Sequence, residues 1–200
     1  MTRSIASLSV MTAFWFTASL LAQTAPAGQP GQTMLPLKPG FALTSPSFED
    51  GGIIPNKYTK AADPAAPVSP ALAWANVPDG AVSFVLTMHD PDSALKRHTD
   101  EVLHWLMFNL PGAARALPEA VPVGARLPDG SIQILNEFKV PGYGAPGAGA
   151  AGPYHHYTLE LYALDIKLNL GPDATEADVE SAMQGHILAK AVVVGRFHRP

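Results

Sequence analysis

Residues 82–92, VSFVLTMHDPD, carry an apolar run that is closed by an Asp-Pro-Asp turn. A short run of branched and aromatic side chains bounded by turn residues predicts a strand that is buried on both faces. Residues 103–108, LHWLMF, predict a second strand of the same kind. Residues 157–163 and 191–197 predict two more strands, and residues 131–135 predict a weaker fifth. Strands therefore dominate the chain.

One helix is predicted late in the chain, after Thr175. Threonine is a favourable N-cap, and the acidic residues Glu176 and Asp178 suit the positive end of the helix dipole. The apolar residues that recur at helical spacing are Val179, Ala182, Met183 and Ile187. Because strands and helices do not alternate, the expected fold is mainly β, a β-sandwich of antiparallel, Greek-key strands with a C-terminal helix.

The composition limits what the chain can do. Its 200 residues are 47% hydrophobic and 15% charged, which is enough apolar surface for one folded domain. With 13 Lys and Arg against 17 Asp and Glu, it has no basic footprint for nucleic acid. The absence of cysteine excludes disulfides, thiol nucleophiles and cysteine-based zinc sites.

The N-terminal region has the profile of a signal peptide. Residues 1–27 combine a short cationic start, an uncharged apolar core and small residues at the exit. Cleavage after Ala22 or near Ala27 fits this pattern, and a retained anchor helix is the alternative. Residues 28–39 then form a flexible leader, and residues 40–200 form the domain. We expect an exported protein, periplasmic or secreted, with no stable membrane span after the signal is removed.

Three polar segments interrupt the apolar pattern. The Asp90-Pro91-Asp92 turn ends one strand, His104 lies inside another, and His155-His156-Tyr157 begins a third. Each has an ordinary explanation as turn chemistry or as a hydrogen-bonded core residue. Together they offer imidazole and hydroxyl donors beside a carboxylate, which are the parts of a small anion pocket.

Common enzyme motifs give no support to other functions. Residues 142–147, GYGAPG, match the dinucleotide pattern G-x-G-x-x-G, but the following residues 148–153, AGAAGP, cannot open a helix. The chain contains no G-x-S-x-G elbow, no H-E-x-x-H pair and no Walker loop. The standard hydrolase and nucleotide-hydrolase interpretations therefore lose their basis.

Several ordered motifs together resemble the phosphatidylethanolamine-binding protein family, and most closely its bacterial branch, the Raf kinase inhibitor-like proteins. The resemblance covers residues 41–199. The segments that carry it are 48–58 (FEDGGIIPNKY), 69–74 (SPALAW), 85–92 (VLTMHDPD), 104–111 (HWLMFNLP), Asn136 with 142–144 (GYG), 152–157 (GPYHHY), and 185–189 (GHILA) followed by Gly195.

This resemblance implies a β-sandwich with a preformed cavity for phosphate-bearing head groups or similar small anions, without cofactor or metal. A protonated histidine is expected to attract the anion. The Gly-rich segment 143–152 would form a lip over the cavity. The implied ligand-binding residues are Asp90, Pro91, His104, Gly147, His155 and Tyr157.

The sequence departs from the family pattern at two places. Ala148-Gly149 replaces the usual Pro-Pro pair of the lip, and Ser93-Ala94 replaces the Ala-Pro that often follows the Asp-Pro-Asp motif. Glycine and alanine do not restrict φ as proline does, so we expect a looser lip and an altered ligand preference.

Other interpretations stay open on the sequence alone. His104, His155 and Asp90 have the chemistry of a metal site, and Asp90 with His104 could act as a base in a hydrolase or metal-assisted enzyme. Inhibition of a kinase or protease, or an unidentified protein partner, rests on family analogy. The remaining histidines are less easily placed: His89 alternates away from Asp90, His186 is expected inside the C-terminal helix, and His98 and His156 are unassigned.

Overall fold

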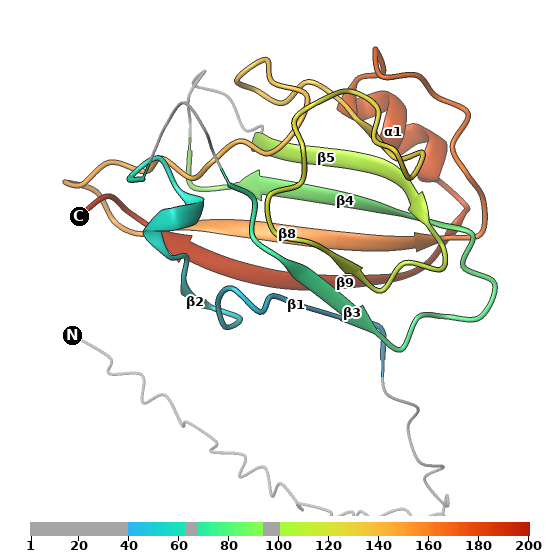
Figure 1. Cartoon of the computed structure of the whole chain (residues 1–200), viewed down its shortest axis with the longest axis horizontal. Coiled ribbons are helices and arrows are strands. Elements are labelled where there is room, and N and C mark those ends of the chain that lie inside the picture. The colour runs from blue at the N-terminus through green and yellow to red at the C-terminus, as the bar shows by residue number, and fades with distance from the viewer. Residues whose placement is uncertain (1–39, 63–67, 94–100) are drawn as a thin grey trace, which may run out of the picture. The chain divides into compact units, whose positions relative to one another are not determined.

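The computed structural model describes residues 40–62, 68–93 and 101–200. The expected signal peptide and leader lie outside these residues, as does His98. The elements are β1 (Ala42–Thr44), β2 (Gly52–Ile53), a 3₁₀ turn (Asn56–Tyr58), β3 (Leu72–Ala75), β4 (Ser83–Asp90), β5 (Val102–Pro111), β6 (Ala116–Leu117), β7 (Ile132–Gln133), β8 (His155–Leu164), α1 (Glu176–Met183) and β9 (Ile187–Phe197) (Figure 1).

A six-stranded sheet in the order β2-β9-β8-β4-β5-β7 forms the main layer. Its long central strands lie side by side in Figure 1 and pair antiparallel. The four strong strand predictions are confirmed, and the weaker one survives as the two residues of β7. The sheet is not wholly antiparallel, because β2 pairs with β9 in parallel.

A three-stranded sheet in the order β1-β3-β6 packs on one face of the main sheet, here called the inner face. Leu43, Trp74 and Leu117 from this small sheet share a core cluster with Phe84 and Trp105 from the main sheet. The rings of Trp74 and Phe84 meet edge to face, with their centroids 5.4 Å apart. The two sheets therefore form a mainly β sandwich, as the sequence predicts.

The opposite, outer face of the main sheet carries α1. A capping box begins the helix: the Asp178 N–H donates to Thr175 Oγ1, and the Thr175 N–H donates to the Asp178 carboxylate. Val179 and Met183 pack into a second core cluster with outer-face residues such as Phe108. Within the described residues, no helix is long and apolar enough to cross a membrane.

The helix is shorter than the sequence predicts. It ends at Met183, and Gly185 adopts a φ of +81°, which turns the chain back toward the sheet. Ile187 is therefore the first residue of β9 and not a helical residue. His186 also lies outside the helix, where its Nδ1 contacts Asp165 Oδ1 at 2.9 Å.

A β-bulge in β5 determines where His104 points. Met88 pairs with Trp105 and His89 pairs with Leu103, so His104 is the extra residue between them. Leu103 contributes to the outer core cluster, whereas Trp105 contributes to the inner one. Strict alternation would turn His104 away from the side that Trp105 faces. The bulge instead allows both side chains to point to the inner side.

Candidate functional site

A cavity of about 280 Å³ lies where the polar ends of β4 and β8 meet the bulge of β5. Its walls come from these strands, from the segment after β7 and from the Gly-rich lip. The lining residues are Lys60, Asp90, Ser93, Val102, His104, Phe138, Gly147, Ala148, Gly149, His155 and Tyr157.

Asp90 is the buried carboxylate of this cavity, with only 4% of its surface exposed. Its Oδ2 accepts a hydrogen bond of 2.8 Å from Nδ1 of His155. Its Oδ1 accepts from the backbone N–H of Asp92 at 3.0 Å, the closure expected of an Asp-Pro-Asp turn. The turn therefore orients the carboxylate, and the carboxylate in turn orients the His155 ring.

His104 is almost completely buried and is held by the lip. Its Nδ1–H donates to the Gly144 carbonyl at 2.6 Å, and its ring packs edge to face on Tyr157, with the centroids 5.1 Å apart. Burial lowers the pKa of His104 to about 4, although the Gly144 hydrogen bond and the Asp90 charge oppose this shift. At neutral pH the ring is uncharged, and Nε2 is left as a hydrogen-bond acceptor. The expected protonated histidine is therefore not His104.

Tyr157 supplies a hydroxyl that stays protonated. Burial raises its pKa, and the Asp90 charge adds to the shift. The backbone N–H of Gly147 donates to this hydroxyl at 3.3 Å. Tyr157 therefore ties the lip to β8, and its protonated hydroxyl donates to Asp90 unless a ligand replaces that acceptor.

Lys60 is a cationic residue among the described residues that line the cavity, and the sequence analysis missed it. Its Nζ lies 4.0 Å from the centroid of the Phe138 ring, and its backbone N–H donates to the Pro146 carbonyl at 2.8 Å. Gly147 makes room for it, because a Cβ there would lie 2.7 Å from Lys60 Cδ. Burial and the charge of Arg199 lower the pKa of Lys60. The available signal was its position two residues after the 48–58 motif.

Asn136 fastens the lip to β5. It is 2% exposed, and its Nδ2 donates to the carbonyls of His104 and Gly142 at 3.1 and 3.0 Å. Its Oδ1 accepts from the backbone N–H groups of Phe138 and Val140. All four hydrogen-bonding positions of the amide are used, so Asn136 is a structural part of the site.

Most of the predicted ligand-binding residues come together, and one does not. Asp90, His104, Gly147, His155 and Tyr157 line one cavity, whereas Pro91 is exposed and is not a lining residue. Proline shapes the turn after Asp90 without facing the ligand space.

Two further histidines of the described chain lie outside the cavity. His156 is bound to Asp92 at the surface, through its Nδ1 at 2.9 Å. His89 faces the outer side of the sheet, as its alternation with Asp90 predicts. Neither contributes to the cavity.

The polar groups of the cavity can hold a ligand through hydrogen bonds and charge. Among the described residues, no group of three or more His, Asp or Glu side chains is placed to hold a metal ion. Ser93 lines the cavity, but within the described segments no hydrogen bond joins its hydroxyl to His104 or His155. Such a bond to a base is what activates a hydroxyl nucleophile. The cavity instead combines acceptors on Asp90 and His104 with donors on Lys60 and Tyr157.

A two-sheet sandwich with a small polar cavity at the ends of its central strands defines a class of ligand-binding β proteins. The model of the phosphatidylethanolamine-binding protein family matches residues 44–198. The chain belongs to this family.

Relatives and solved structures of this family are similar over nearly the whole domain. A UPF0098 protein of Methanothermobacter thermautotrophicus is 40% identical over 157 residues, covering 78% of this chain and 98% of the relative. The UPF0098 protein YbhB of Escherichia coli is 36% identical over 132 residues, covering 65% of this chain and 81% of the relative. The crystal structure of CT736 from Chlamydia trachomatis, a homologue of phosphatidylethanolamine-binding protein, has a TM-score of 0.69 at 31% identity and covers 80% of this chain and 99% of that one.

The crystal structure of E. coli YbcL, a member of the mammalian phosphatidylethanolamine-binding protein family, has a TM-score of 0.69 at 26% identity. The match covers 81% of this chain and 100% of that one. These matches confirm the family and the fold that the motifs predict.

Proposed function

We propose that the protein is an exported binding protein whose cavity holds a small anion, such as the phosphate of a phosphorylated head group. The observation that carries this proposal is the convergence of Asp90, His104, His155, Tyr157 and Lys60 on one cavity of about 280 Å³. That volume suits a head group better than a whole lipid, because pockets for larger ligands span about 300 to 1,000 Å³.

The polarity of the cavity favours a phosphate that still carries one proton. The neutral His104 ring offers Nε2 as an acceptor, so a P–OH group can donate to it. Lys60 and Tyr157 can then donate to the charged phosphate oxygens. The dianion has no P–OH group. It would place an unprotonated phosphate oxygen against the acceptors of Asp90 and His104, and this repulsion weakens binding.

Calorimetry with inorganic phosphate and phosphoethanolamine tests this proposal. Asn at position 104 keeps an N–H near the Gly144 carbonyl but removes the Nε2 acceptor, so His104→Asn should weaken binding about ten-fold. Asp90→Asn should also weaken binding, because it disrupts the orientation of His155. Gln in place of the surface residue Glu49 is the matched control and should bind as the parent does.

The pH dependence of binding separates the anion from a metal. Affinity for phosphoethanolamine should rise as pH falls through about 6, where the monoanion of its phosphate monoester becomes the main species. His104→Asn should flatten this dependence. Undetectable binding of both phosphates contradicts the proposal. Zinc binding that tightens as pH rises would indicate a metal site instead, because a histidine must lose its proton to ligate a metal.

Export is a separate part of the proposal, supported by the cationic start and apolar core of residues 1–27. The mature N-terminus isolated from cells should lie between Gln23 and Gly28, as mass spectrometry can determine. Intact Met1 in the membrane fraction contradicts cleavage and favours a retained anchor.

A further inference from the structure

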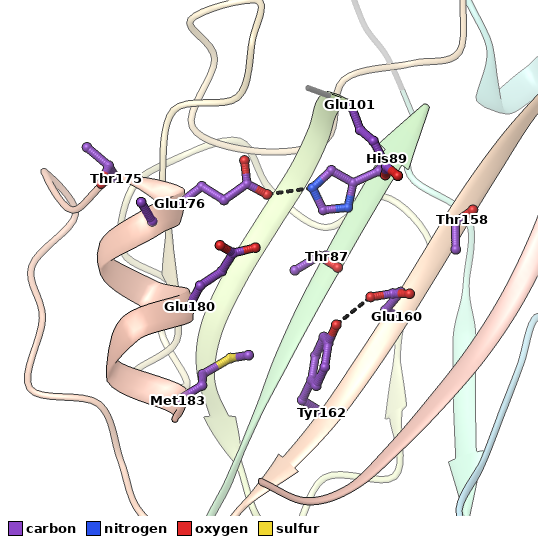
Figure 2. Close-up of a pocket in the computed structure, with 11 residues that line it drawn as sticks. Thr87, His89, Glu101, Thr158, Glu160, Tyr162, Thr175, Glu176, Glu180 and Met183 are labelled. Atoms are coloured by element: carbon purple, nitrogen blue, oxygen red, sulfur yellow. Dashed lines mark hydrogen bonds and ion pairs between the residues drawn. The ribbon is translucent and has the colours of Figure 1, made fainter. Parts of the chain in front are cut away.

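A second and larger hollow lies on the outer face of the main sheet, beside α1 (Figure 2). Its volume is about 700 Å³, and we call it the outer groove. Among the described residues that line it are four glutamates and one basic side chain, that of His89. The groove is defined by Thr87, His89, Glu101, Thr158, Glu160, Tyr162, Thr175, Glu176, Ala177, Glu180 and Met183.

The groove exists because α1 covers only part of the outer face. Val179 and Met183 seal the apolar part of that face. Farther along β8, the inward residues Tyr157 and Leu159 join the inner core, whereas the outward Thr158, Glu160 and Tyr162 are only partly buried and line the groove. The floor of the groove is therefore polar and lies beside a helix that adds further carboxylates.

Two of the four glutamates already have partners. Glu176 is bound to Nε2 of His89, so the first turn of α1 is tied to β4 (Figure 2). Glu160 accepts from Lys190 and from the Tyr162 hydroxyl. Glu180 points from α1 into the space between helix and sheet (Figure 2). Counting only the described lining residues, the groove thus keeps a negative charge after these pairs are formed.

Thr87 provides an observation independent of the acidic residues. It lies on β4 on the same face as His89, and it is 7% exposed. Among the described residues, its Oγ1 has no hydrogen-bond partner. A buried hydroxyl without a partner is costly in a native protein and calls for an explanation. Its lone pairs are available to an N–H donor that enters the groove.

Carboxylates and an unpartnered hydroxyl are acceptors for a cation that carries several N–H donors. A single metal ion does not fit, since the described residues include no group of three or more ligands placed around one point. An elongated ligand does fit, because a neighbouring hollow of about 420 Å³ shares Glu101, Thr175 and Glu176 with the outer groove. From these observations we propose that the outer groove binds a linear polyamine, whose ammonium groups pair with separate glutamates.

The pairing of His89 adds a pH dependence to this site. Burial alone would lower the pKa of His89, but the hydrogen bond and charge of Glu176, with Glu101 and Glu160, outweigh burial and raise it. Protonation of His89 reduces the negative charge of the groove. Polyamine binding should therefore weaken as pH falls.

Calorimetry of the full chain with spermidine, at low and constant ionic strength, tests the proposal. Glu180→Gln removes one carboxylate from an exposed helix position and should weaken binding about five-fold. Glu49→Gln changes the net charge equally at a residue that does not line the groove, and it should leave the affinity unchanged. Equal affinities in the parent and both variants would show non-specific attraction and overturn the proposal.

Thr87→Val separates a binding role from a structural one. Valine has nearly the same shape and removes the unpartnered hydroxyl, so the melting temperature should be equal or higher while spermidine affinity falls. Unchanged spermidine affinity in Thr87→Val would show that the unpartnered hydroxyl does not take part in binding and would overturn the proposal. Tighter binding of Mg²⁺ than of spermidine would also overturn it, in favour of a metal ion. Phosphate binding, which concerns the inner cavity, should be unaffected by these variants.

Discussion

Acid should destabilise this protein through His104. The pKa of its ring is about 4 in the fold, because the side chain is buried, whereas in the unfolded chain it is about 6.5. Between these values the unfolded chain binds a proton that the folded chain does not, so the free energy of unfolding falls as pH falls. A difference of about 2.5 in pKa corresponds to a loss of about 3 kcal/mol by pH 4.

Urea denaturation followed by tryptophan fluorescence measures this loss. His104→Asn keeps a donor for the Gly144 carbonyl but does not titrate, so it serves as the reference. The free energy of unfolding of the parent minus that of His104→Asn should decrease by about 3 kcal/mol between about pH 7.5 and pH 4. Parallel curves for the two proteins, or a His104 ring that titrates near 6.5 in NMR spectra, would refute the reasoning.

Three further predictions concern the lip and the outer groove. Gly147→Ala should displace the stem of Lys60 and weaken phosphate binding about ten-fold by calorimetry. Gly149→Ala is the control, because a Cβ at this position meets nothing within 4 Å, and it should leave phosphate binding unchanged. An equal loss of phosphate affinity in both variants would contradict the role of Lys60 in binding. Asn136→Ala leaves several buried backbone groups unpaired and should lower the free energy of unfolding by at least about 3 kcal/mol. A loss below about 1 kcal/mol would contradict the structural role of Asn136. His89→Gln should lower the free energy of unfolding more at about pH 5.5 than at about pH 9. The raised pKa of His89 in the fold stabilises the protein at low pH, and this contribution is lost as pH rises. Denaturation curves that show an equal loss at the two pH values would contradict this prediction.

Much of the main sheet was predictable from local pattern. The runs that became β4, β5, β8 and β9 are long, apolar and bounded by turn residues, so their strand character follows from the side chains alone. The individual strands of the small sheet were not predicted, because β1, β3 and β6 are 2 to 4 residues long and form through pairing with distant parts of the chain. The helix was overextended by one turn, since Ile187 satisfies both helical spacing and the start of a strand.

The polar parts of the inner cavity were also visible in the sequence. Asp90, His104, His155 and Tyr157 stand where apolar residues or strand ends were expected, and their ordered motifs identify the family. Lys60 carried no comparable signal, because a lysine beside a turn is ordinary at a protein surface. Its place in the cavity depends on the space that Gly147 leaves.

The sequence by itself determined the strand-rich fold, the family and the identity of the titratable groups, because these follow from residue types and local order. Only the tertiary structure decided their chemical state. Burial makes His104 a neutral acceptor, and the hydrogen bond with Glu176 raises the pKa of His89 on the opposite face of the sheet. Solvation and charge around a side chain come from segments distant in the sequence, so the same residue type acquires different properties at the two sites.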